Sequence, residues 1–235
     1  MFVQKASDVL NMVTEQELPK HTDALLAVLV QAVRGDESYV GPITNLIVKK
    51  AVRDPDSSGL YACLCSDAVT KASKTRYFAV VHDVFIKKMK TSCLRALRDL
   101  PKTYDPTTGS QTEYSVSKKV RVRTMETCRF IGWLFMLNKF KMSHTVKKTV
   151  SGLLASGDAH CLECLCALLQ IIGPRFEMVD QVSKHCSAGK VYKTLEKYAG
   201  NGMQPARTVR RINRIILERN YNWLVRKPSS LQYQY

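Results

Sequence analysis

The sequence has no apolar run long enough to cross a membrane. None of its windows holds the roughly 18 uninterrupted apolar residues that a spanning helix needs. Residues 1–11 also lack the charged-then-apolar arrangement of a secretory signal. We therefore expect a soluble intracellular protein without a membrane partner. Most of the eight cysteines lie inside apolar stretches, as reduced core thiols do, and this fits the same expectation.

Motifs of the common enzyme classes are missing as well. No P-loop glycine precedes Gly189-Lys190, and neither H-E-x-x-H nor G-x-S-x-G occurs. His82 and Asp83 could form half of a metal-dependent phosphohydrolase site, but a pair on a helix surface explains them better. We therefore expect a protein that is not an enzyme, with no catalytic residues and no cofactor.

One histidine- and cysteine-rich stretch invites comparison with a zinc site. Its residues are His160, Cys161, Cys164 and Cys166, with His185 and Cys186 as a second half. Zinc ligands converge from turns, usually as two Cys-x-x-Cys knuckles. Here the cysteines alternate with leucines in a helical pattern, so core cysteines are the better interpretation and no metal site is expected.

Strand signals are nearly absent, whereas helical periodicity recurs along the chain. The segment 14–17 is typical of a capping box that opens a helix, with Thr14 as the N-cap and Glu17 reaching back. We place helices near 2–12, 15–34, 39–53, 57–70, 77–99, 120–139, 143–155, 159–172, 177–199 and 204–219. Ten helices with short links favour an all-α, HEAT-type right-handed solenoid of about five antiparallel helix pairs over a compact bundle.

One polar stretch interrupts the helical pattern. Residues 100–118 contain Pro101, Pro106 and Gly109 and almost no apolar residue, which predicts a long exposed loop. A domain boundary is the alternative, but it would leave neither half with a natural cap. We therefore expect a single domain over 1–235, ending in a short tail at about 228–235.

Acidic residues are the scarcer charged type: 20 Asp and Glu stand against 36 Lys and Arg, a formal net charge of +16. Residues 1–60 carry six basic and eight acidic residues, whereas residues 121–235 carry nineteen and seven. Such an asymmetric excess points to an anionic partner, nucleic acid first and a membrane surface second. A basic surface that only keeps the protein in solution is the alternative.

The sharpest basic pattern lies near the C-terminus. Four arginines at i, i+3, i+4 and i+7 share one helix face: Arg207, Arg210, Arg211 and Arg214. Phosphate contact would relieve their mutual repulsion. A solvated face with acidic neighbours is the alternative. Further basic clusters comprise Lys118, Lys119, Arg121 and Arg123, and then Lys184, Lys190, Lys193 and Lys197.

Six short segments together are similar to the middle domain of translation initiation factor 4G. In chain order they are 9–14 (VLNMVT), 46–52 (LIVKKAV), 128–135 (CRFIGWLF), 161–173 (CLECLCALLQIIG), 206–211 (ARTVRR) and 222–227 (NWLVRK). The resemblance covers nearly the whole chain. It implies a crescent of five HEAT-like helix pairs without catalysis, which binds the DEAD-box helicase of translation initiation and contacts RNA.

The resemblance also implies helicase-contact residues. The family pattern L-N-x-L-T-P-x-x-F falls on Leu10, Val13 and Leu18, with Glu15 in place of the proline and Leu18 in place of the aromatic residue. Packing within the first helix pair is the alternative role for Leu10 and Val13. Trp223, at the other end, either covers the last helix pair, which we favour, or touches the second helicase lobe.

No tyrosine fits the Y-x-x-x-x-L motif by which such scaffolds hold a cap-binding protein. A cap-binding protein would therefore be reached only through chain beyond these residues. We expect a cytoplasmic scaffold that docks and stimulates the initiation helicase and binds RNA, with the four arginines and the 118–123 cluster as the RNA contacts. The alternative is a stand-alone RNA-binding adaptor of the same fold, acting in nuclear cap binding, mRNA decay or poly(A)-linked translation control.

Overall fold

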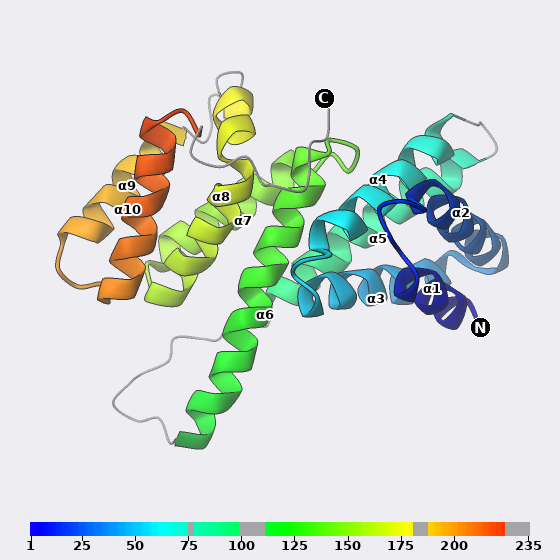
Figure 1. The fold of residues 1–235 in the computed structure, drawn as a ribbon, viewed down its shortest axis with the longest axis horizontal. Coiled ribbons are helices and arrows are strands. Elements are labelled where there is room, and N and C mark those ends of the chain that lie inside the picture. Colours follow the sequence, from blue (N-terminus) through cyan, green and yellow to red (C-terminus); the bar gives the residue numbers. More distant parts are fainter. Residues whose placement is uncertain (75–77, 99–110, 181–187, 224–235) are drawn as a thin grey trace. The chain divides into compact units, whose positions relative to one another are not determined.

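The computed structural model describes residues 1–74, 78–98, 111–180 and 188–223. These ranges form ten α-helices and one short 3-10 helix, η1 (Glu37–Tyr39), and they contain no strand (Figure 1). The α-helices are α1 (Phe2–Asn11), α2 (Leu18–Gly35), α3 (Val40–Arg53), α4 (Ser58–Ser73), α5 (Ala79–Arg98), α6 (Gln111–Met136), α7 (Ser143–Ser156), α8 (Ala159–Asp180), α9 (Ala188–Gly200) and α10 (Ala206–Asn220).

Consecutive helices pack against each other: α1 on α2, α3 on α4, α5 on α6, and α9 on α10. The prediction of an all-α fold built from paired helices is confirmed. The helices group into two compact units, residues 1–149 and 150–235. None of the described helices is long and apolar enough to span a membrane.

The core of the first unit forms where α3 packs on α4, α5 and α6. Ile43 and Ile47 of α3 and Met89 of α5 are fully buried. The rings of Phe85 and Phe140 meet edge to face, with centroids 5.8 Å apart. Burial of each side chain of this size stabilises the fold by roughly 1.5–3 kcal/mol. These apolar contacts therefore hold the helices of the first unit in register.

The second unit is built around α8, which packs on α9 and α10. Its leucines Leu162, Leu165 and Leu169 are fully buried, as are Leu195 of α9 and Ile212 of α10. Because α8 is apolar around most of its circumference, it serves as the central helix of this unit.

The helix boundaries differ most from the prediction in two regions. Helix α6 begins at Gln111, so residues 111–118 are helical and the predicted loop at 100–118 is wrong over its last part. The polarity of this segment was misleading, because helix propensities of ordinary residues differ by no more than about 0.7 kcal/mol and composition alone therefore does not separate a polar helix from a loop. The rest of the predicted loop, the tail at 228–235, and Lys184, His185 and Cys186 lie outside the described residues.

The second difference concerns Pro174. We predicted a helix end at 172 and a new helix from 177, but α8 continues through Pro174 to Asp180. Proline removes one backbone hydrogen bond and normally stops or kinks a helix. Here Phe176 is buried, and Glu177 accepts a hydrogen bond from Arg219 of α10 at 2.6 Å. These tertiary contacts hold the last turn in place.

Candidate protein-docking edge and nucleic-acid interface

The first predicted helicase contact, Leu10, lies in the core. Leu10 stands at the end of α1 and is 1% exposed. The Tyr61 hydroxyl of α4 donates a 3.5 Å hydrogen bond to the Leu10 carbonyl oxygen. A side chain so enclosed offers no surface to a partner. Of the two roles that the sequence left open, packing within the first helices is therefore the one that the structure gives Leu10.

Apolar surface does remain in the link between α1 and α2. Val13 and Leu18 are half-buried, and Met12 beside them is 60% exposed. We call these three residues, Met12, Val13 and Leu18, the N-terminal edge. Sequence reasoning missed Met12, although its place beside Val13 in a short inter-helix link would have suggested it.

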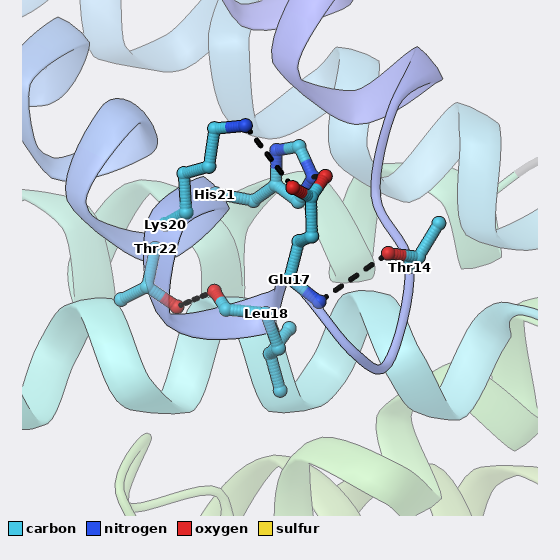
Figure 2. Close-up of polar contacts among 6 residues, drawn as sticks. All are labelled: Thr14, Glu17, Leu18, Lys20, His21 and Thr22. Carbon is cyan, nitrogen blue, oxygen red and sulfur yellow. Dashed lines mark hydrogen bonds and ion pairs between the residues drawn. The ribbon is translucent and has the colours of Figure 1, made fainter.

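The link itself is held by polar contacts (Figure 2). The Glu17 backbone N–H donates to Thr14 Oγ1 at 3.4 Å, which is one half of the predicted capping box. The other half does not form, because α2 begins only at Leu18, with Pro19 in its first turn. Proline is favoured at that position, since the first N–H groups of a helix have no partner within it.

The Glu17 carboxylate turns forward along α2 instead of back to Thr14. It accepts a 3.1 Å hydrogen bond from Lys20 Nζ, and His21 Nε2 lies 3.5 Å from its second oxygen without forming a hydrogen bond. The Lys20 ammonium, chiefly, holds the pKa of Glu17 below its usual value. Figure 2 shows the Leu18 side chain pointing away from this charged group, so one turn carries a polar and an apolar side.

Trp223 covers the end of the second unit. Its ring lies against Gly173 of α8, and its centroid is 6.3 Å from that of Tyr192 in α9. The Arg219 guanidinium stacks over the other ring at 4.4 Å from the Tyr192 centroid. The sequence left two roles open for Trp223. These contacts correspond to the first of them, covering the last helices.

The four arginines of α10 lie on a polar face, as the spacing predicts, and Ile212 and Ile215 are buried on the other. Acidic residues partly neutralise that face. Arg207 Nε lies 3.5 Å from Glu163 of α8, and Arg214 Nε donates to Glu218 at 3.0 Å. Arg210 is exposed and forms no ion pair with any residue that the structure describes. The face therefore has both the free charge that phosphate contact needs and the acidic neighbours of the alternative interpretation.

All four residues of the second predicted basic cluster lie on α6, which begins earlier than the helix predicted over 120–139. Lys118, Lys119 and Arg123 are exposed, and Arg121 is half-buried. Arg123 also lines a cleft in the first unit. Arg121, Arg123 and the two lysines thus present cations along nearly two turns of one helix.

The seven described cysteines are buried and form no disulfide with one another, which confirms the prediction of core thiols for them. His160 packs on Cys164, with Nε2 3.6 Å from the sulfur. Burial raises the pKa of Cys166 to about 12, so its thiol stays protonated at neutral pH. Among the described residues no group of three His, Cys, Asp or Glu side chains could hold a metal ion. His82 Nδ1 and Asp83 Oδ1 are 2.8 Å apart on the surface of α5.

Paired helices with apolar cores, an apolar edge and basic outer faces define a helical scaffold domain. The sequence model of the MIF4G domain matches residues 4–201, and the chain belongs to that family. MIF4G domains are non-catalytic scaffold domains that bind protein and RNA partners.

A named relative extends the comparison. The chain is 28% identical to eukaryotic translation initiation factor 4 gamma 3 of Mus musculus, in an alignment of 197 residues that covers 72% of this chain. The alignment covers 12% of that relative, so the chain spans a small part of its length. The resemblance to translation initiation factor 4G that the sequence motifs carried is thereby confirmed as a distant relationship.

Proposed function

We propose that this domain is a translation initiation scaffold in the cytoplasm that binds and stimulates a DEAD-box RNA helicase and contacts RNA. The observation that carries the proposal is membership of the MIF4G family together with similarity to a protein named as a translation initiation factor. A cap-binding protein would join the assembly only through chain beyond these residues.

The N-terminal edge is the proposed first contact with the helicase. Half-buried apolar side chains beside a charged turn are typical of a protein interface, where an apolar centre is surrounded by polar residues. Val13 and Leu18 carry the apolar centre, and the Glu17–Lys20 pair lies at its rim. Because Leu10 is buried in the core whereas Val13 and Leu18 are half-buried, substitution of Val13 and Leu18 tests binding with less disturbance of packing than substitution of Leu10.

The proposed mechanism is bracing of the helicase at two points. One helicase lobe meets the N-terminal edge, and the other meets the helices of the second unit, with Trp223 closing that unit. A scaffold that contacts both lobes only in their closed, RNA-gripping arrangement raises the population of that arrangement. Stimulation then needs no catalytic group from this chain.

Binding to the helicase tests the proposal. The double variant Val13→Asp and Leu18→Asp should lose helicase capture in a pull-down while its circular dichroism and melting temperature stay near wild type. A matched double variant at exposed apolar positions elsewhere, Val80→Asp and Met178→Asp, should keep capture. Capture that survives the first pair of substitutions would move the contact away from the N-terminal edge.

The alternative is an RNA-binding adaptor of the same fold that acts without the helicase, in nuclear cap binding, mRNA decay or poly(A)-linked control. The exposed Arg210 and the cations of α6 favour it. This function predicts RNA affinity that is independent of the helicase. Charge reversal at Arg207, Arg210, Arg211 and Arg214 should flatten the salt dependence of that affinity, and an unchanged slope would exclude this face as the RNA surface.

A further inference from the structure

A cleft of about 310 Å³ opens where α3, α5 and α6 of the first unit meet. Figure 1 shows these three helices in the blue-to-green part of the ribbon. Among the described residues, the lining of the cleft combines four cations, four other polar residues and four small apolar ones: Lys49, Arg53, Arg95, Arg123, Asn45, Ser92, Thr124, Thr127, Val48, Val52, Ala96 and Val120. No carboxylate is among these lining residues.

The four cations are exposed, and none of them has an acidic partner among the described residues. No ion pair joins Lys49, Arg53, Arg95 or Arg123 to any residue in the described ranges. Elsewhere in the chain, Lys20, Lys71, Arg129, Arg207, Arg214 and Arg219 each contact a carboxylate. Like charges gathered at one cleft repel each other. A bound anion would remove that repulsion, so the cleft is suited to an anionic ligand.

The buried hydroxyls of the cleft present lone pairs and not hydrogens. Thr124 donates its hydroxyl hydrogen to the Val120 carbonyl at 2.9 Å, and Thr127 donates to the Arg123 carbonyl at 2.8 Å. Because each hydroxyl has one hydrogen, these two oxygens can only accept from a ligand.

The Ser92 hydroxyl hydrogen is also engaged, in a hydrogen bond to Thr44. Thr44 donates to the Gly41 carbonyl at 2.9 Å, so the 2.8 Å contact between Ser92 Oγ and Thr44 Oγ1 requires Ser92 to be the donor. The Ser92 oxygen then also keeps only lone pairs. A ligand seated here needs negative charge toward the exposed cations and hydrogen-bond donors toward the buried hydroxyls.

A ribonucleotide has both properties, since its phosphate is anionic and its ribose hydroxyls and base N–H groups donate. A carboxylate side chain has the charge but no donor, and it would face three acceptor oxygens. We propose that this cleft binds one nucleotide of single-stranded RNA, with the phosphate on Arg53, Arg95, Arg123 and Lys49, and with the ribose 2′-hydroxyl and the base N–H donors toward Ser92, Thr124 and Thr127. This site rests on the RNA contact proposed above and gives it a location in the first unit.

Fluorescence anisotropy with a labelled oligouridylate tests the site. The triple variant Arg53→Ala, Arg95→Ala and Arg123→Ala should bind at least tenfold more weakly. Its slope of log K against log salt should become shallower by about 0.7, the contribution of the one phosphate contact that the site makes on a single strand. A charge-matched control, Lys74→Ala, Lys87→Ala and Lys148→Ala, should change the affinity less than twofold. All six positions are exposed, so circular dichroism should show intact folding.

Failure of the cleft as an RNA site and failure of RNA binding as a whole give different results. Wild-type affinity in the cleft variant, with binding lost in a variant of Arg207 and Arg210, would overturn the cleft and leave the proposed RNA contact standing. No RNA binding by the wild type would overturn both. The cleft variant should still capture the helicase, and loss of capture would make the cleft a protein site.

Ligand class is tested in the same assay. Oligodeoxyuridylate should bind several-fold more weakly than the RNA, because it lacks the ribose 2′-hydroxyl donor. Equal binding of the two would contradict the role of the three hydroxyl acceptors. An oligoglutamate peptide that displaces the RNA at equal concentration would show that the cleft takes acidic peptide, and would overturn the proposal.

Discussion

The ring of Trp223 occupies the space into which a side chain at residue 173 would project, so only glycine fits there. Gly173 lies in the middle of α8, one residue before Pro174, and a glycine inside a helix normally costs stability. The close approach of the ring explains its presence. Trp223 itself has a φ of 63°, in the left-handed region, and contact with Gly173 and Tyr192 stabilises that unfavourable conformation.

Substitution Gly173→Ala should therefore destabilise the fold. The added methyl group would overlap the Trp223 ring, and overpacking of this kind costs about 1–3 kcal/mol. Chemical denaturation measures the change. Gly152→Ala is the matched control in α7, because nothing lies within 4 Å of its added carbon, and it should gain about 0.5–1 kcal/mol from helix propensity.

A double-mutant cycle assigns the loss to this contact. Once Trp223→Ala has removed the ring, Gly173→Ala should cost little, so that the two changes are far from additive. Additive losses would mean that Gly173 is required for some other reason than the approach of Trp223.

Glu163 holds the buried end of the arginine face on α10. Its side chain is 9% exposed, its carboxylate accepts a 3.4 Å hydrogen bond from buried Thr208, and Arg207 lies beside it. Glu163→Ala would leave the Thr208 hydroxyl without that partner, which should cost about 1–3 kcal/mol in thermal or urea unfolding. Arg207→Ala should cost less than about 1 kcal/mol, since the arginine is largely exposed. Equal losses would mean that the ion pair, and not the buried hydrogen bond, stabilises the helix.

Asp158 precedes α8 and caps it. Its carboxylate accepts hydrogen bonds from the Cys161 N–H at 2.9 Å and the Ser156 hydroxyl at 2.5 Å. Partial burial alone would raise the pKa of Asp158, but the hydrogen bonds outweigh it and the pKa lies below its usual value. A lowered pKa in the folded state means that the stabilisation is present above the unfolded value, near 3.9, and is lost as the pH falls through the folded one.

Asp158→Ala should thus cost about 1 kcal/mol at neutral pH. Urea titrations over a pH series should show this difference from wild type narrowing below about pH 4. Asp158→Asn, which keeps an acceptor without the charge, should lose less at neutral pH, and its smaller difference from wild type should narrow over the same pH range, because the titrating group belongs to the wild type. A wild-type advantage that stays constant down to low pH would contradict the ionised cap.

Much of the fold was predictable because apolar spacing at 3.6 residues survives in most helices. Leu25 and Leu29 of α2, for example, stand four residues apart, the spacing of one helix face, and both are buried. The predicted helix boundaries were wrong where tertiary contacts outweigh the local sequence signals for a helix end. Pro174 predicts a helix end, yet Phe176 and the Glu177–Arg219 pair keep the helix intact.

The candidate sites were less predictable than the fold. The spacing of the arginines in the sequence predicted that they share one face of α10. It did not predict Glu163, which contacts that face from α8. Lys49 and Arg53 stand four residues apart on α3, a signal for one shared face, but only packing brings Arg95 and Arg123 to them. Leu10 matched a contact motif, and its burial became visible only in the structure, where α2 and α3 pack on α1.

The ATPase rate of the initiation helicase, measured with RNA and rising concentrations of this domain, tests the central claim most directly. We predict a rate that rises and saturates with the wild-type domain, that stays at its basal value with Val13→Asp and Leu18→Asp, and that rises normally with Val80→Asp and Met178→Asp. A rate that does not respond to the wild-type domain at saturating concentrations would contradict the scaffold function.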